Sequence, residues 1–310
     1  MFSEPSSQAA LLPERCLRKR LNTNHCTRCL DVCPSSALGL KGREIVLDET
    51  KCSGCMACVS ACPQDALVSD TDLDELLCLI KAGRDVIVSC VRQAQNQPAE
   101  VVVPCVGLFS KQFLTAIFVS DCRSVTFDML GCSKCGNREV ATAFMADHKL
   151  VIENLSDIAP SNLVIAQKSE KPQNAAIDRR SYLANFKKII FGVTKKRFTS
   201  ESPSANHQNN KGRRVPYKTK LVQNLIVGQR DDSRKRILSL LGNCLSVNDK
   251  CTCCPLCKGI CPTGALNIER SEQGKKLKFE MLDCSGCGLC VEFCKKGALS
   301  LERSTSRLFG

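Results

Sequence analysis

The chain has 310 residues, among them 24 Cys, no Trp and 2 Tyr, and its formal net charge is +13. This length suggests two or three domains. No apolar run reaches the ~18 residues of a membrane-spanning helix, and residues 1–13 form a short polar segment rather than a secretory signal. We therefore expect a cytoplasmic protein in which clustered cysteines bind metal instead of forming disulfides.

Four runs of closely spaced cysteines dominate the sequence. They span residues 26–33, 52–62, 251–261 and 284–294, and the first run lacks its leading Cys. Their C-x2-C-x2-C-x3-C spacing resembles that of bacterial ferredoxins with two [4Fe–4S] clusters, in which the last Cys of each run binds the cluster of the other run. The pattern predicts an α+β ferredoxin-like domain at each end of the chain, at residues 14–70 and 236–304.

The N-terminal pair of runs predicts two clusters, one of them with an unusual ligand. Cys33, Cys52, Cys55 and Cys58 complete the first set. For the second set, Thr23 stands where the leading Cys is expected, and Cys16 is the only upstream candidate. The predicted ligands of this second cluster are Cys16, Cys26, Cys29 and Cys62. A three-iron cluster, an iron open to an outside ligand, or His25 as a ligand are the alternatives.

The C-terminal pair of runs predicts two further [4Fe–4S] clusters. One is assigned to Cys251, Cys254, Cys257 and Cys294, and the other to Cys261, Cys284, Cys287 and Cys290. Lys295 replaces the usual Pro after the last Cys, which loosens a turn without removing a ligand. Cys244 and Cys253 are left over, and we interpret them as ordinary buried or half-buried thiols.

An Ala-Leu pair follows each cysteine run at the same offset. The four pairs are Ala37-Leu38, Ala66-Leu67, Ala265-Leu266 and Ala298-Leu299. They predict duplicated helix-then-strand units packed over the clusters. Zinc, which uses isolated C-x2-C pairs, does not explain runs of three or four cysteines, and pairing of clusters favours electron transfer over a purely structural staple.

The positive charge overstates how basic the folded protein is. An oxidised [4Fe–4S] cluster with its four thiolates carries roughly −2, so four clusters would offset about 8 positive charges. Nucleic-acid binding is therefore not expected from the charge. Because the chain has neither a G-x-G-x-x-G fingerprint nor a P-loop, no flavin, nicotinamide or nucleotide site is expected either.

Residues 71–168 change in character and predict a small α/β domain with a parallel sheet. Helical patterns at 72–81, 111–119 and 137–148 alternate with apolar runs at 86–88, 101–103 and 125–127. Each apolar run leads to cysteines: Cys90, Cys105, and the pair Cys132 and Cys135. Since the ends of parallel strands share one edge, these four cysteines are expected to meet. Cys78 and Cys122 are interpreted as ordinary buried cysteines.

This middle segment resembles the iron–sulfur delta subunit of methyl-viologen-reducing hydrogenase, the partner of heterodisulfide reductase. The resemblance covers roughly residues 85–150 and rests on Pro104-Cys105-Val-Gly107 and Gly131-Cys132-x-x-Cys135-Gly-Asn137. It implies a [2Fe–2S] cluster on Cys90, Cys105, Cys132 and Cys135. Two alternatives stay open, namely a redox-active dithiol formed by Cys132 and Cys135, and ordinary buried cysteines.

Residues 169–235 are polar and basic and predict a linker. A short amphipathic helix is predicted at 182–198, followed by a segment poor in apolar residues at 200–218. The linker carries basic runs at 187–188, 195–197, 211–214 and 218–220. We interpret them mainly as a solvated or disordered segment, with docking to an acidic redox partner or contact with an anionic membrane surface as the functional alternatives.

The sequence as a whole predicts an electron-transfer subunit rather than a catalyst. Four [4Fe–4S] clusters and one [2Fe–2S] cluster would relay electrons between redox enzymes, for which the resemblance suggests hydrogenase, formate dehydrogenase or heterodisulfide-reductase-like complexes. Two hypotheses compete with this one. They are a thiol or disulfide reductase that uses Cys132 and Cys135, and an iron–sulfur redox sensor whose cluster state changes partner binding.

Overall fold

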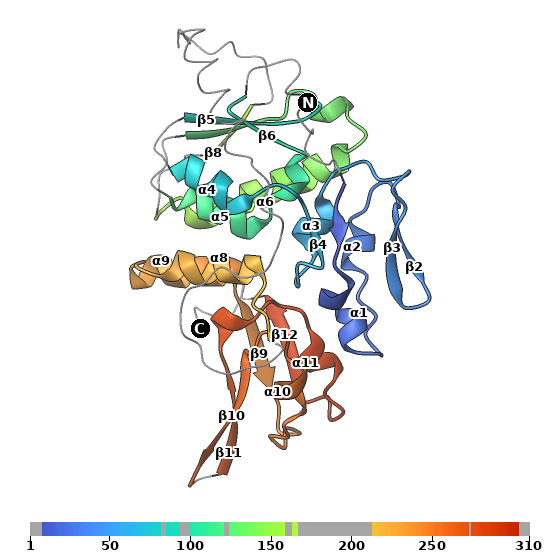
Figure 1. Ribbon diagram of the computed structural model, residues 1–310. Helices are drawn as coiled ribbons and strands as arrows, with labels where there is room; N and C mark the ends of the chain where they lie inside the picture. Colours follow the sequence, from blue (N-terminus) through green and yellow to red (C-terminus); the bar gives the residue numbers. More distant parts are fainter. Residues whose placement is uncertain are drawn as a thin grey trace. The chain divides into compact units, whose positions relative to one another are not determined.

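The computed structural model describes residues 8–81, 85–93, 99–120, 124–158, 163–166, 213–272 and 274–303 (Figure 1). All of them belong to the first of the chain's two units, which comprises Met1–Gln167 and Gly212–Gly310. The second unit, Lys168–Lys211, lies outside the described residues, and so does the helix predicted at 182–198. The described residues form two cysteine-rich parts, a sheet domain and a pair of helices.

The N-terminal cysteine-rich part contains two small antiparallel pairings. Strand β1 (Ala10–Leu11) pairs with β4 (Leu67–Val68), and β2 (Leu38–Lys41) forms a hairpin with β3 (Glu44–Leu47). The helical segments here are η1 (Pro13–Arg15), α1 (Leu17–Arg20), α2 (Arg28–Asp31) and α3 (Ala57–Ala61). Helices α2 and α3 are short because Pro34 and Pro63, which follow each cysteine run, disfavour helix in the residues before them.

The C-terminal cysteine-rich part repeats this arrangement. Strand β9 (Asn243–Val247) pairs with β12 (Leu299–Arg303), and β10 (Leu266–Ser271) pairs with β11 (Gly274–Phe279) in a hairpin. In both parts, therefore, the first strand pairs with the last and the middle two form a hairpin. The helical segments are α10 (Leu256–Ile260), η4 (Met281–Asp283) and α11 (Leu289–Glu292).

The Ala-Leu pairs behave as the repeat predicts. All eight residues are buried, and the leucines open β2, β4, β10 and β12, directly after the helices α2, α3, α10 and α11. The helix-then-strand unit is thus confirmed in all four copies.

The middle domain is a four-stranded, all-parallel sheet in the order β6-β5-β7-β8. Its strands are β5 (Asp85–Cys90), β6 (Val101–Val103), β7 (Ser124–Asp128) and β8 (Leu163–Ala166). Helices α4 (Leu73–Lys81), α5 (Lys111–Phe118) and α6 (Arg138–Leu155) lie on the same side of it in Figure 1. The predicted strands and helices are confirmed, although α6 continues beyond residue 148 and β8 was not predicted.

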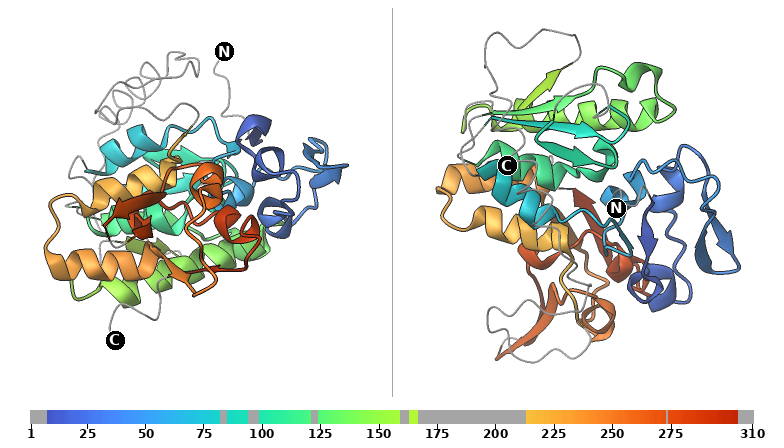
Figure 2. Two further views of the ribbon diagram at one scale, coloured as in Figure 1. Left: turned by 90° about the horizontal axis from the view of Figure 1, so that it is seen from below. Right: turned by 45° about the horizontal axis from the view of Figure 1, so that its top comes forward.

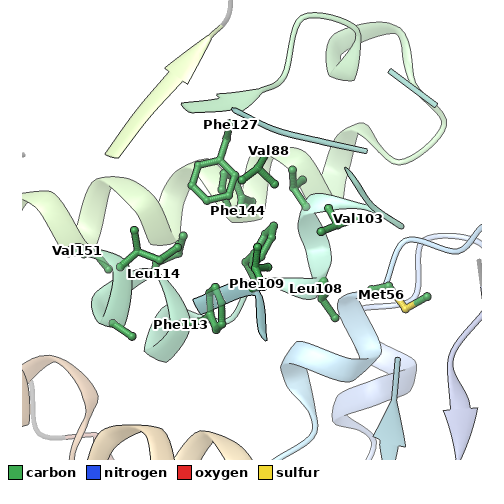
Figure 3. Close-up of a cluster of buried hydrophobic side chains, with 14 of the residues drawn as sticks. Met56, Val88, Val103, Leu108, Phe109, Phe113, Leu114, Phe127, Phe144 and Val151 are labelled. Atoms are coloured by element: carbon green, nitrogen blue, oxygen red, sulfur yellow. The ribbon is translucent and has the colours of Figure 1, made fainter. Parts of the chain in front are cut away.

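Four phenylalanines form the centre of the core beneath this sheet (Figure 3). The Phe127 ring, from β7, lies with its centroid 5.0 Å from that of Phe144 and 5.2 Å from that of Phe109, and Phe109 lies 5.4 Å from Phe113. These rings are almost fully buried, and such edge-on and tilted pairs add to the stabilisation from burial itself. Met56 of the N-terminal part belongs to the same core cluster, so the two parts share one apolar interior.

Two helices occupy part of the segment that the sequence predicts to be a linker. Helices α8 (Tyr217–Ile226) and α9 (Asp231–Leu241) pack against α5 and α6 (Figures 1 and 2). They bury seven apolar side chains in the shared core: Leu221, Val222, Leu225, Ile226, Ile237, Leu240 and Leu241. The prediction of a linker as far as residue 235 is therefore wrong for residues 217–235, where apolar residues at helical spacing outweigh the basic composition.

Cys78 also differs from its prediction. It is exposed, because it lies on the outer face of α4 while Leu76, Leu77 and Ile80 point into the core. Cys122 lies outside the described residues. None of the helices in the described ranges has both the length and the apolar character needed to cross a membrane.

Candidate iron–sulfur centres

Every cysteine in the described residues is a free thiol. The candidate ligands fall into five groups, which we call sites A to E. Site A comprises Cys90, Cys105, Cys132 and Cys135; site B comprises Cys33, Cys52, Cys55 and Cys58; site C comprises Cys16, Cys26, Cys29 and Cys62; site D comprises Cys261, Cys284, Cys287 and Cys290; site E comprises Cys251, Cys254, Cys257 and Cys294.

Site C brings together four cysteines that include Cys16. Burial, reinforced by nearby thiolates, raises the pKa of Cys29 to about 12, and those thiolates belong to Cys62, Cys26 and Cys16. Cys16 itself has a raised pKa because of burial first and then because of the charges of Cys62 and Cys26. The η1 turn and α1 on either side of Cys16 carry it back to the cysteine run, whereas Thr23 and His25 are exposed.

Site B lies next to site C. Burial raises the pKa of Cys58 to about 12, and the thiolates that add to this rise are those of Cys55, Cys29, Cys33 and Cys52. Three of these four belong to site B. The fourth, Cys29, belongs to site C, so the two groups lie within electrostatic range of each other. This is the arrangement expected when paired runs exchange their last ligand.

Site A gathers the four cysteines from the strand ends of the sheet. Cys90 ends β5, Cys105 follows β6 and precedes the turn η2 (Val106–Leu108), and Cys132 and Cys135 border the turn η3 (Cys132–Lys134) after β7. Burial raises the pKa of Cys132 to about 12, and the charges that add to it are those of Cys90, Cys105, Cys135 and Asp128. The common edge of the parallel sheet thus brings together residues far apart in the sequence.

Site A also lies against site B. Burial raises the pKa of Cys105 to about 11, and Cys55 of site B is among the charges that contribute, beside Cys90 and Cys135. The Arg92 guanidinium bridges the two sites, since its Nη1 lies 3.5 Å from Cys135 Sγ and its Nη2 donates to the carbonyl oxygen of Ser53 at 3.3 Å.

Sites D and E are formed by the C-terminal part. At site D, burial raises the pKa of Cys290 to about 12, with added repulsion from Cys287, Cys284 and Cys261. At site E, burial raises the pKa of Cys257. A hydrogen bond from the Lys258 amide opposes this rise, and the charges of Cys254 and Cys251 add to it. Cys294 packs against an apolar cluster that contains Cys257 of site E together with Cys261 and Cys290 of site D.

Sites C and D meet across the boundary between the two cysteine-rich parts. Leu17, Leu21 and Leu289 form a small buried cluster there, and Cys26 of site C and Cys287 of site D both pack against it. Four side chains of the N-terminal part also donate hydrogen bonds to the C-terminal part, and one of them is Arg20, whose Nε donates to Ile260 O at 3.0 Å. Arg28 Nη2 donates to Gly286 O at 2.9 Å, Asn24 Nδ2 to Glu292 Oε2 at 2.5 Å, and Gln64 Nε2 to Ser285 Oγ at 2.6 Å.

Two basic side chains, Arg28 and Lys218, lie close to the cysteines of these sites. Burial raises the pKa of the Cys287 thiol, while the positive charge of Arg28 opposes that rise. Lys218 of α8 is largely buried, and its Nζ donates to the carbonyl oxygens of Val59, Ser60 and Cys62 at the end of α3. Sequence reasoning missed Arg28, Arg92 and Lys218 as site residues. The positions of Arg28 beside Cys29 and of Arg92 near Cys90 were the only available signals.

Backbone amides donate to several of the cysteine sulfurs. Such hydrogen bonds are expected if the five groups of cysteines bind clusters as thiolates. Ala66 N donates to Cys62 Sγ at 3.3 Å and Ala298 N to Cys294 Sγ at 3.4 Å, in each case four residues after the cysteine. For Cys33, burial would raise the pKa, but hydrogen bonds from the Leu38 amide, the Ser35 hydroxyl and the Ala37 amide outweigh burial, and the pKa is lowered. The alanines of three of the four Ala-Leu pairs, Ala37, Ala66 and Ala298, therefore stabilise negative sulfur.

Amides serve the same purpose at sites A and D. Asn137 N, at the start of α6, donates to Cys135 Sγ at 3.5 Å, and Gly286 N donates to Cys284 Sγ at 3.4 Å. Within the described part of the chain, no three His, Cys, Asp or Glu side chains converge as the ligands of a single metal ion do. A zinc site requires that convergence, whereas in an iron–sulfur cluster the thiolates are shared among different irons. The residues present fit clusters better than zinc.

One comparison with known proteins gives a match. Residues 22–66 match the family model described as a 4Fe-4S dicluster domain, and this range contains every ligand proposed for sites B and C except Cys16. No curated protein and no solved structure matches the chain. The N-terminal part is thus a ferredoxin-type 4Fe–4S unit, and the chain is an iron–sulfur protein suited to electron transfer.

Proposed function

We propose that this protein relays single electrons through five iron–sulfur centres in the order A, B, C, D, E. Sites B to E would each hold a [4Fe–4S] cluster, and site A a [2Fe–2S] cluster. Such clusters accept and release one electron at a time over a wide range of potentials. The C-terminal part would be a second ferredoxin-like unit, and the protein would work in the cytoplasm.

The observation that carries the proposal is the proximity of successive sites. Cys105 and Cys55 connect A to B, Cys58 and Cys29 connect B to C, and Cys26 and Cys287 flank the leucine cluster between C and D. Within the C-terminal part, one apolar cluster contains Cys261 of site D and Cys257 of site E. Each site lies near at least one other site, whereas a cluster that only stabilised the fold could stand alone.

The residues around each site would hold the clusters and adjust their charge. Backbone amides at Cys33, Cys62, Cys135, Cys284 and Cys294 stabilise thiolates. Arg28, Arg92 and Lys218 add positive charge beside them. Positive charge favours the more negative, reduced state of a centre, so these residues would raise reduction potentials.

The grouping at site A weighs against a dithiol reductase. Cys132 and Cys135 lie with Cys90 and Cys105 instead of standing as an exposed pair. By resemblance, the partners of the relay would be hydrogenase, formate dehydrogenase or heterodisulfide-reductase-like complexes.

Anaerobic purification followed by iron and sulfide analysis tests the proposal. We expect about 18 irons per chain, and electron paramagnetic resonance of the reduced protein should show interacting [4Fe–4S] signals. A Cys132→Ser variant should lose about two irons while the other signals remain. Little or no iron after careful reconstitution would refute the relay, and a full complement in the Cys132→Ser variant would remove site A from it.

A further inference from the structure

Site E is the most exposed of the five sites. Every candidate ligand lies in the described residues, and Cys254 alone among them is exposed. It lies in the loop before α10, and Cys253 beside it adopts a left-handed backbone with a φ of 50°. An outside redox protein could approach site E more closely than any other site.

Four exposed lysines surround this site, and we call them the lysine face: Lys250, Lys275, Lys295 and Lys296. Lys250 precedes Cys251, and Lys295 and Lys296 follow Cys294. Lys275 is held beside the loop because Cys253 Sγ donates to its carbonyl oxygen at 3.2 Å. Asn248 Nδ2 donates to Gly297 O at 3.2 Å, which joins the loop of Lys250 to the turn of Lys295 and Lys296.

The charge of the lysine face is not neutralised by its own surroundings. In the described part of the chain, none of its four ammonium groups forms an ion pair, whereas Lys278 on the same hairpin pairs with Glu269 at 3.0 Å and Glu280 at 3.3 Å. Asp249 is the only carboxylate between Cys244 and Cys261. Four lysines outnumber the combined charge of Asp249 and of an oxidised cluster at site E, which is roughly −2 with its thiolates. The face therefore keeps a positive charge that attracts an anionic surface.

Apolar side chains accompany these charges. Leu256, two residues after Cys254, is 40% exposed, and Val247, at the end of β9, is 46% exposed. Weak electron-transfer complexes have small interfaces in which charges orient the partners and a few apolar contacts hold them together. An exposed site that carries both lysines and exposed apolar side chains matches that description.

We propose that the lysine face docks a small acidic electron-carrier protein, which exchanges electrons with site E. This inference rests on the proposed function. In the exchange, the reduced carrier loses one electron and site E gains it, and no bond is made or broken. Site E would thus be one terminus of the relay, and the acidic carrier its soluble partner.

Reduction by flavodoxin hydroquinone, an acidic protein donor, provides the test by stopped-flow spectroscopy. We expect the rate to fall at least ~10-fold when ionic strength is raised, because steered association is screened by salt. A Lys250→Glu/Lys295→Glu variant should be slowed about 10-fold at low ionic strength and lose most of its salt dependence. Its reduction by the methyl viologen radical, a small cation, should be as fast as before or faster.

Lys41→Glu serves as the matched control, since Lys41 is exposed on the β2–β3 hairpin, the counterpart of β10–β11 in the N-terminal part. This variant should behave as the unchanged protein. Carbodiimide cross-linking provides a second measurement that does not depend on electron transfer, and it should join flavodoxin carboxylates to residues of the lysine face.

Three results would overturn the docking proposal: a rate independent of salt in the unchanged protein, equal slowing by Lys41→Glu, or cross-links only outside the lysine face. In each case the methyl viologen radical would still reduce the protein, and the relay would stand. Failure of the relay itself would appear differently, as a low iron content and no reduction by either donor.

Discussion

Gly107 lies so close to the carbonyl oxygen of Cys55 that a Cβ built on the glycine would stand 2.2 Å from it. The same Cβ would stand 2.5 Å from the Val140 side chain and 3.1 Å from Ala57 N. Only a residue without a side chain allows the turn after Cys105 to approach the cysteine loop of site B this closely. The contact between sites A and B depends on it.

Replacement of Gly107 by alanine should separate these two sites. Because the obstructing atoms include backbone, we expect the turn to shift, with a loss of about 1–3 kcal/mol in the free energy of unfolding. The magnetic interaction between sites A and B in the reduced protein should weaken. Gly136→Ala is the control, since a Cβ there meets nothing within 4 Å. Equal effects of the two substitutions would contradict this account.

Removal of the Arg92 guanidinium should make site A harder to reduce. Arg92 is exposed, so we assign its interaction with Cys135 about 1 kcal/mol, which corresponds to roughly 40 mV for a one-electron couple. Redox titration of Arg92→Gln should show the potential of site A lowered by about that amount. In Arg92→Lys, the reduction potential of site A should stay close to that of the unchanged protein, because lysine keeps the positive charge. Arg270→Gln, on β10, should change nothing at site A, and an unchanged potential in Arg92→Gln would refute the assignment.

Loss of Cys16 should damage site C alone. A Cys16→Ser variant should lose about one iron, if a three-iron cluster remains, and up to about four, if the cluster is not retained. Cys78→Ser should keep its full iron content, because Cys78 is exposed on α4 and outside all five sites. If Cys16→Ser also kept its iron, the fourth ligand would have to come from elsewhere.

Acid should destabilise the middle domain through His148. Burial lowers the pKa of His148 below its usual 6.5, although a hydrogen bond with the backbone of Leu163 opposes this shift. The unfolded chain therefore takes up the proton first as the pH falls below about 6.5, and the stability present above that value is lost. Melting temperatures at about pH 8 and about pH 5.5 should differ less in His148→Leu than in the unchanged protein. An identical pH dependence in both would exclude His148 as the cause.

The cysteine spacing and the strand pattern predicted much of this molecule. Spacing alone grouped the cysteines of the paired runs, and the alternation of apolar runs and helical patterns predicted the parallel sheet. The sheet in turn explains why Cys90, Cys105, Cys132 and Cys135 meet, since the cysteines follow strands whose ends share an edge.

Helix α8 was not predicted, because its basic composition outweighed its apolar pattern in the sequence analysis. Leu221, Val222, Leu225 and Ile226 have helical spacing, yet the basic residues around them led to the prediction of a linker. Lys218 could not be recognised as a buried residue from the sequence, because its burial depends on carbonyl oxygens that α3 supplies. Arg28 and Arg92 were missed for the same reason, since their acceptors belong to other parts of the chain.

The contacts of Asp65 have a consequence for how the protein matures. Its carboxylate accepts a hydrogen bond from Tyr217 N at 2.5 Å and pairs with Arg214 at 3.6 Å. Tyr217 is 152 residues further along the chain, so a ribosome finishes both N-terminal cysteine runs long before it makes α8. Until then Asp65 lacks its partners Tyr217 and Arg214, and the carbonyl oxygens at the end of α3 lack Lys218. The N-terminal cysteine runs are thus synthesised well before the helix that packs against them.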